Sequence, residues 1–161
     1  MLRRLMILSC AWVSVTAVGR SQAVGGVSAT DAILARQASL DMSSITFRSM
    51  VDAMKAGREA KSQSYQAAVL AKWAKALPQM FPSGSGQGET SAATQALPQI
   101  WRDRPGFAMA AANYADATSR LTALAGANDT QGFTTQLEKV DQACGSCHAR
   151  FKEGAQGPPK R

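Results

Sequence analysis

The amino-acid sequence predicts an all-α protein that folds as an antiparallel four-helix bundle. Four stretches carry apolar side chains three and four residues apart, the spacing that places them on one face of an α-helix. No stretch alternates apolar and polar residues over a useful length, so a β-sheet is not expected. Helices of about 20 residues joined mostly by short connections close most economically as a bundle.

The composition is that of an ordinary globular domain. Of the 161 residues, 45% are hydrophobic and 18% are charged, which argues against a disordered, collagen-like or multi-span membrane protein. This length suits a single domain with one hydrophobic core. Basic residues outnumber acidic ones by 18 to 11, so the formal net charge is +7.

The N-terminus predicts a secretory signal peptide at residues 1–23. A basic start at residues 1–4 precedes a mostly apolar run, Leu5 to Val18, and Ser21-Gln22-Ala23 places small residues at the two positions that a signal peptidase reads. We therefore expect export to the periplasm and a mature domain at residues 24–161.

Two alternatives stay open for this segment. An uncleaved membrane anchor needs about 20 mostly apolar residues, whereas the run is shorter and is interrupted by Ser9, Ser14 and Thr16. A lipoprotein site at Cys10 would leave the apolar stretch 11–18 on the mature protein.

Removal of residues 1–23 changes both the charge and the cysteine count. Three arginines and no acidic residue are lost, so the net charge falls from +7 to +4. The remaining basic residues are scattered and are not interleaved with aromatic ones, so no nucleic-acid partner is expected. Cys10 is also lost, which leaves Cys144 and Cys147 beside His148, the only histidine of the chain.

The first two predicted helices span Thr30–Lys55 and Arg58–Leu77. Thr30 and Asp31 are available to cap the first helix, and Pro78 ends the second because it lacks an amide donor. The apolar positions expected to trace these helices are Ile33, Leu40, Phe47, Val51 and Met54 in the first, and Tyr65, Val69, Trp73 and Leu77 in the second.

A loop and two further helices complete the predicted bundle. Residues 82–91 have the Gly- and Ser-rich composition of a flexible loop. The third helix runs from Pro105 to Gly126, and the fourth begins at caps among residues 128–130. The fourth helix carries a single stripe, formed by Phe133, Leu137, Val140, Cys144, Cys147, His148 and Phe151.

The last helix carries a haem-attachment motif. Cys144-Gly145-Ser146-Cys147-His148 matches the Cys-x-x-Cys-His pattern of c-type haem. Helical residues three apart lie about 5–6 Å from one another on one face, which allows two thiols to add to neighbouring vinyl groups of a porphyrin. The adjacent imidazole can then reach the iron. We therefore predict one covalently bound haem c near the C-terminal helix.

Three other interpretations of the motif stay open. A thioredoxin-type dithiol sits where a strand feeds a helix, and no strand is expected before Cys144. A zinc site requires four good ligands, and the mature chain offers only Cys144, Cys147 and His148. A structural disulfide fits a helical separation of three residues poorly.

Three segments together resemble the class II c-type cytochromes, the family typified by cytochrome c′. They are Arg36-Gln37-Ala38-Ser39-Leu40, Leu97-Pro98-Gln99-Ile100-Trp101, and the stretch from Cys144 to Lys152. The resemblance covers essentially all of the mature chain. It implies a four-helix bundle whose haem motif lies near the C-terminus.

The resemblance also implies the roles of individual residues. Cys144 and Cys147 would be the thioether anchors, and His148 the proximal axial ligand. Arg36 and Gln37 match a pair that contacts the haem and its propionates, a role that suits the forked guanidinium. The alternative for this pair is a solvated helix surface.

The sixth coordination position is expected to be empty of protein ligands. The resemblance implies that Leu40 faces the distal side of the iron, and leucine cannot coordinate iron. Met42 is turned by about 200° from Leu40 on a helix, so it should point away. We expect a five-coordinate, high-spin iron in an apolar pocket that admits small neutral ligands such as NO and CO.

Two functions follow as hypotheses: a gas-binding haem protein, and an electron carrier that serves redox partner proteins. A low-spin carrier would need a methionine as sixth ligand, although Met50, Met54, Met80 and Met109 are all expected in the core. An enzyme is not expected, because no general acid or base is spaced to serve the iron. The resemblance further implies a homodimer formed through the first helix and its neighbour.

Overall fold

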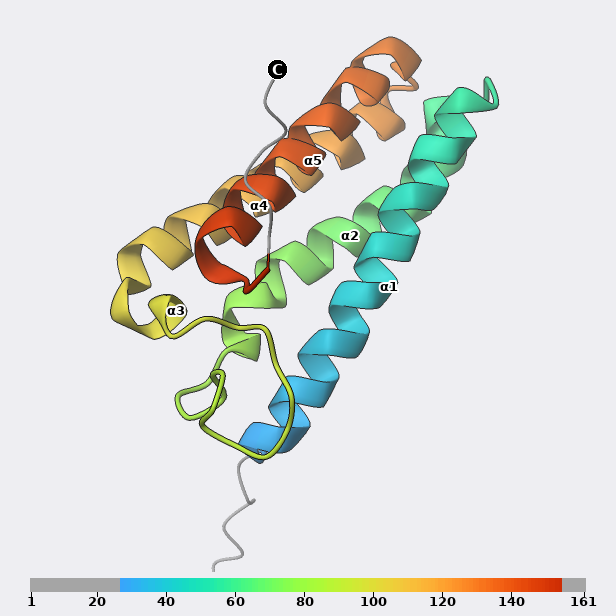
Figure 1. Ribbon diagram of the computed structural model, residues 1–161. Coiled ribbons are helices and arrows are strands. Elements are labelled where there is room, and N and C mark those ends of the chain that lie inside the picture. Colours follow the sequence, from blue (N-terminus) through green and yellow to red (C-terminus); the bar gives the residue numbers. More distant parts are fainter. Residues whose placement is uncertain (1–26, 155–161) are drawn as a thin grey trace, which may run out of the picture.

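The computed structural model describes residues 27–154 as a bundle of helices (Figure 1). The predicted signal peptide at residues 1–23 lies outside the described residues, as does the tail from residue 155. The long helices are α1 (Ala29–Lys55), α2 (Ser64–Ala76), α4 (Arg104–Gly126) and α5 (Thr130–Phe151). The short elements are the single turn α3 (Gln99–Arg102) and two 3₁₀ helices, η1 (Ala60–Gln63) and η2 (Leu77–Met80).

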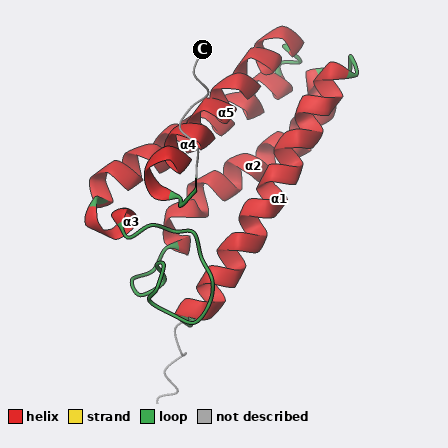
Figure 2. Cartoon of the chain, viewed as in Figure 1, coloured by secondary structure: helices red, strands yellow, loops and turns green. Residues whose placement is uncertain are grey.

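The all-α four-helix prediction is confirmed. Figure 2 shows helices and loops throughout the described part of the chain, and no strand among them. One isolated antiparallel bridge pairs Ala96 with Lys152. Within residues 27–154, no helix is both long enough and apolar enough to cross a membrane.

Side-chain caps fix where three of the long helices begin. The Ser28 hydroxyl accepts a hydrogen bond from the Asp31 amide at 3.1 Å, so Ser28 rather than Thr30 or Asp31 caps α1. Asp103 and Asp129 accept in the same way from the amides three residues later. Each cap satisfies an amide that has no partner within its helix.

The end of α1 also follows from the sequence. The helix stops at Lys55, and Gly57 takes a φ of 70°, a left-handed conformation that favours glycine after a helix.

The second helix differs from its prediction in both extent and orientation. It starts at Ser64 rather than Arg58, and η2 continues the chain through Pro78, which is tolerated in the first turn of a new helix. Tyr65 and Val69, which the spacing assigned to the core stripe, are 80% and 40% exposed. The face that is buried consists mainly of alanine: Ala67, Leu70, Ala71 and Ala74. Small side chains let α2 approach its neighbours closely, so the larger residues did not mark the buried face.

Aromatic rings join three separate segments of the chain in the core. Phe81 meets Phe107 edge-on at 5.0 Å between centroids, and Phe107 meets Phe151 in the same way at 5.4 Å. Such tilted pairs place a positive ring edge against a negative ring face. The end of η2, the start of α4 and the end of α5 are therefore held together at one end of the bundle.

The segment between η2 and α3 has the irregular backbone that its composition predicts, but it is tied to the end of α5. The Leu97 amide donates to the Phe151 carbonyl at 3.0 Å, and the Glu153 amide donates to the Gln95 carbonyl at 2.8 Å. Gln87 Nε2 also donates to the Glu153 carboxylate at 2.6 Å.

Candidate functional site

The haem-attachment motif lies on the last turns of α5, and helix geometry runs unbroken through it. Cys144 and Cys147 are free thiols, half-buried and packed against the hydrophobic core. His148 is exposed. The helix therefore presents both thiols to the interior, and the exposed imidazole lies next to them in sequence.

The surroundings of the motif shift the pKa of each of its three side chains in the direction that favours the uncharged form. Burial, with smaller contributions from Asp141 and Cys147, raises the pKa of Cys144 to about 11. Burial also raises the pKa of Cys147. His148 is exposed as a whole residue, but partial desolvation of its imidazole lowers its pKa, and the nearby Lys152 charge lowers it further. A neutral imidazole is the form that binds a metal.

The alternative interpretations of the motif find no support in the described residues. The two cysteines do not form a disulfide. Within residues 27–154, no group of three or more His, Cys, Asp or Glu side chains converges as a metal site would require, so a zinc set is not assembled. The chain that leads into Cys144 is helical, whereas a thioredoxin-type dithiol follows a strand.

Arg36 is buried, which rules out a solvated surface position. Its side chain is only 2% exposed. The guanidinium donates to Ser85 Oγ at 2.8 Å, to the Ser85 carbonyl at 2.6 Å and to Thr94 Oγ1 at 2.7 Å. It also lies 4.7 Å from the centre of the Phe81 ring. Burial lowers the pKa of Arg36, as expected for a cation removed from water.

Gln37 and Leu40 lie on the same helix and are half-buried. Gln37 Nε2 donates to the Ala93 carbonyl at 2.9 Å. Leu40 packs against the core from the side of α1, whereas Met42 is 69% exposed, as the helical rotation predicts.

The methionines only partly follow the expectation that they fill the core. Met50 is fully buried, and Met54 and Met80 pack against the core. Met109 is 65% exposed, so its assignment to the core was wrong. The prediction used only the apolar character of Met109, whereas its exposure depends on how much of that face of α4 the other helices cover.

Helices α1 and α5 each have a stretch without fully buried residues. In α1 the buried residues are Ala32, Ile33, Arg36 and Met50, so none lies between positions 37 and 49. In α5 none lies between positions 141 and 150, which include the motif. Figure 1 shows α1 and α5 on opposite sides of the view, with α2 between them. Half-covered apolar residues on both helices, two thiols and one imidazole fit a flat apolar cofactor such as haem.

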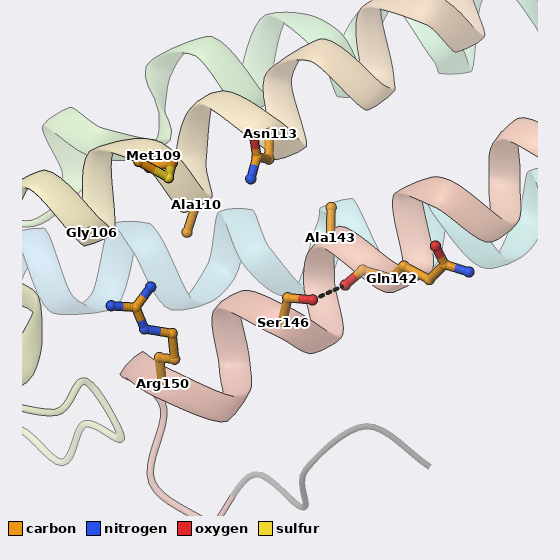
Figure 3. A pocket seen from close by; sticks show the side chains of 8 residues that line it. All are labelled: Gly106, Met109, Ala110, Asn113, Gln142, Ala143, Ser146 and Arg150. Atoms are coloured by element: carbon orange, nitrogen blue, oxygen red, sulfur yellow. Dashed lines mark hydrogen bonds between the residues drawn. The ribbon is translucent and has the colours of Figure 1, made fainter. Parts of the chain in front are cut away.

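A separate shallow pocket lies between α4 and α5. Its volume is about 200 Å³, and Figure 3 shows the side chains that line it, among them Met109, Gln142, Ser146 and Arg150. The Ser146 hydroxyl donates to the Gln142 carbonyl at 2.8 Å. None of the three motif side chains lines this pocket. It was not predicted, because it depends on how two distant helices pack.

Sequence reasoning also missed Ser85 and Thr94. They reach Arg36 across 49 and 58 residues of chain. Both residues lie between η2 and α3, where the composition predicted a loop but no particular contact.

The comparisons with known proteins agree with this arrangement. A family model described as cytochrome C′ matches residues 31–152. Cytochrome c-554 of Cereibacter sphaeroides is 32% identical over 102 residues, a match that covers 63% of this chain and 61% of the relative. The chain thus matches less than two thirds of the length of that protein.

Relatives with the name cytochrome c′ match over more of their length. Cytochrome c′ of Rubrivivax gelatinosus is 30% identical over 126 residues, covering 76% of this chain and 95% of the relative. Its crystal structure superposes with a TM-score of 0.69 at 29% identity, over 78% of this chain and 97% of that one. A ferrous variant of Alcaligenes xylosoxidans cytochrome c prime with bound NO has a TM-score of 0.68 at 25% identity, over 77% and 94%. The chain belongs to the cytochrome c′ family.

Proposed function

We propose that this chain is an exported haem c protein whose five-coordinate iron binds NO and CO and takes part in electron transfer. One haem would be attached to each chain through thioether bonds to Cys144 and Cys147, with His148 as the axial ligand. The bound iron supplies a centre that accepts a diatomic gas and changes between the ferric and ferrous states. This makes the protein a binding and electron-transfer protein rather than an enzyme.

The observation that carries this proposal is the position of the motif. Both thiols are half-buried on α5 and face the core. The opposite stretch of α1 presents Leu40, Phe47 and Val51, which are also only partly covered. A haem held by the motif would cover these apolar surfaces, which the protein otherwise leaves incompletely packed.

Leu40 supports the five-coordinate state and the gas ligands. Its aliphatic side chain excludes water from the distal side and offers no donor to a bound O₂. The NO-bound relative from Alcaligenes xylosoxidans, at 25% identity, is consistent with a gas as ligand.

Arg36 supports a carboxylate-bearing cofactor. Its guanidinium is buried and bonded only to neutral oxygen atoms. A haem propionate would supply the counter-charge that such a cation requires. Gln37, next to it, would add an amide contact.

A low-spin electron carrier is the second candidate function. Met54 and Met80 pack at the edge of the core in the same way as Leu40. Either sulfur would have to replace Leu40 at the iron. An optical spectrum distinguishes the two functions, because a methionine ligand gives a low-spin spectrum with a methionine–iron charge-transfer band, and five-coordinate iron gives a broad high-spin Soret band.

We also propose a homodimer formed through α1 and α2. Large apolar side chains are exposed on these two helices: Met42 69%, Ile45 68%, Tyr65 80% and Val69 40%. A groove of about 190 Å³ lies between the helices, lined by Met42, Val69 and Trp73 among others. Exposed apolar area of this kind indicates a protein–protein contact.

Export and haem attachment are tested together. The full chain is expressed in a bacterial host that attaches haem to exported proteins, and the purified product is examined by mass spectrometry. We expect a chain that begins at Val24 and carries the added mass of one haem. A chain that retains residues 1–23, or that lacks the haem mass, would overturn export or haem attachment respectively.

A further inference from the structure

Arg36 is a buried cation whose described partners carry no charge. Its three hydrogen bonds go to two oxygen atoms of Ser85 and to Thr94 Oγ1. Among residues 27–154 the recorded ion pair joins Arg150 to Asp103, not Arg36 to a carboxylate. Because buried charges are normally paired, the site calls for an anion.

The guanidinium retains donors for that anion. Arginine has five N–H hydrogens in a rigid fork, and the hydrogen bonds to Ser85 and Thr94 occupy three of them. Two hydrogens therefore have no acceptor among the described residues.

The two hydroxyl groups that hold Arg36 differ in what they can still do. Ser85 is fully buried, and its own hydrogen goes to the Pro82 carbonyl at 2.8 Å. Thr94 Oγ1 accepts twice, from Arg36 and from the Ala96 amide at 3.2 Å. Among the described residues its hydrogen has no acceptor, and Thr94 is only half-buried. Thr94 can therefore donate to a ligand, whereas Ser85 cannot.

This cluster lies at the end of the bundle where the haem motif ends. Arg36 stacks on Phe81. The ring contacts from Phe81 through Phe107 lead to Phe151, which follows His148 by three positions. Leu40 follows Arg36 by one helical turn. A cofactor held by α5 and covered by Leu40 would therefore have its polar edge near Arg36 and Thr94.

We propose that Thr94 is a second hydrogen-bond donor, beside Arg36, to a carboxylate of the bound haem, and that Ser85 is a positioning residue that fixes the guanidinium. This rests on the proposed function, because it requires a haem in the site. Charge-assisted bonds to a carboxylate are stronger than neutral ones, so the Thr94 hydroxyl would bind its charged form firmly.

The test compares the haem-loaded wild type with three variants. Thr94→Val removes the hydroxyl at nearly constant shape, and Thr94→Ser keeps it. Thr90→Val is the matched control, because Thr90 Oγ1 accepts the Ala92 amide at 3.1 Å just as Thr94 Oγ1 accepts the Ala96 amide. The measurements are the reduction potential and the resonance Raman bands of the haem carboxylates.

Loss of the donor leaves the carboxylate charge less compensated, which favours the ferric state. In Thr94→Val we expect the equilibrium constant for reduction to fall about threefold, or about 28 mV for a one-electron couple. The carboxylate Raman band should shift as well. Thr94→Ser and Thr90→Val should match the wild type in both measurements. If Thr94→Val does not fold, Thr94→Ala must give the same two changes.

The failures are distinguishable. A wild type without haem would overturn the proposed function, and this inference with it. Haem-loaded Thr94→Val, or Thr94→Ala in its place, with an unchanged potential and unchanged carboxylate bands would overturn the inference alone. Equal shifts in Thr90→Val and Thr94→Val would also overturn it, because the effect would then come from the loop and not from the donor.

Discussion

At the residue scale, the proposed function makes the character of the iron site depend on Leu40. Replacing Leu40 with methionine should place a thioether sulfur at the sixth position. We expect the optical spectrum to change from five-coordinate high-spin to six-coordinate low-spin, and the affinity for CO to fall because the sixth position is filled.

Met42 provides the matched control for this substitution. It lies two positions along α1 and is 69% exposed, so Met42→Leu should leave the spectrum unchanged. An unaltered spectrum in Leu40→Met would show that another face of α1 covers the iron.

Arg36 is expected to stabilise the fold even before haem is attached. In the haem-free chain, Arg36→Met removes three hydrogen bonds and leaves the Ser85 carbonyl and both hydroxyl groups with fewer partners. Each bond to a charged donor contributes about 1.5–3 kcal/mol, offset by the cost of burying the charge. Because the buried cation has no counter-charge in the haem-free chain, this cost removes much of the gain, and we expect the free energy of unfolding in urea to fall by only about 1–2 kcal/mol.

Arg48→Met, on the exposed surface of the same helix, serves as the control and should change the free energy of unfolding by less than about 0.5 kcal/mol. Equal losses in the two variants would mean that the Arg36 contacts do not stabilise the chain.

Functional residues could be predicted only where their partners lie close to them in the sequence. The Cys144, Cys147 and His148 spacing is visible in five consecutive residues. The partners of Arg36 were not visible, because hydroxyl groups 49 and 58 residues away meet it only through the path of a loop. Whether Arg36 and Gln37 contact haem stays a prediction.

At the element scale, α2 shows where helical periodicity misleads. The large residues Tyr65 and Val69 suggested one face, whereas alanines and Leu70 form the buried one. Leu70→Ala should therefore cost about 2–5 kcal/mol of unfolding free energy through the cavity it leaves. Urea unfolding of dilute, monomeric protein measures this loss.

Tyr65→Ala is the comparison for α2. Because Tyr65 is 80% exposed, its truncation should change the free energy of unfolding by less than about 1 kcal/mol. If Tyr65→Ala lowered the free energy of unfolding more than Leu70→Ala, the buried face of α2 would be the one that the spacing predicted.

The other long helices were predictable because capping and termination are local. Asp129 and Gly57 act within three or four residues of the helix ends that they set, and Pro105 marks the start of α4, although its cap Asp103 was not predicted. The single turn α3 and the two 3₁₀ helices were not predicted, because elements of four residues carry no periodic signal.

At the scale of the whole molecule, the exposed apolar surface of α1 and α2 predicts self-association. A charge in its centre should oppose this, so Met42→Glu should convert the dimer to a monomer in sedimentation equilibrium. Met109→Glu is the matched control, since Met109 is a similarly exposed methionine, 65% against 69%, on α4. A dimer that persists in Met42→Glu, or that is lost equally in Met109→Glu, would contradict this interface.

The architecture itself could be predicted because four amphipathic helices have few ways to bury their apolar faces. Which face of α2 turns inward, and which apolar side chains stay outside, could not. Those features depend on the packing of all the helices together, as Met109 and Tyr65 show.

The most direct test of the account is peptide mass spectrometry of the exported protein, isolated from a host able to attach haem. We expect the peptide that contains Cys144 and Cys147 to carry one haem, and both thiols to resist alkylation. A colourless protein in which both cysteines react with an alkylating reagent would contradict the central claim.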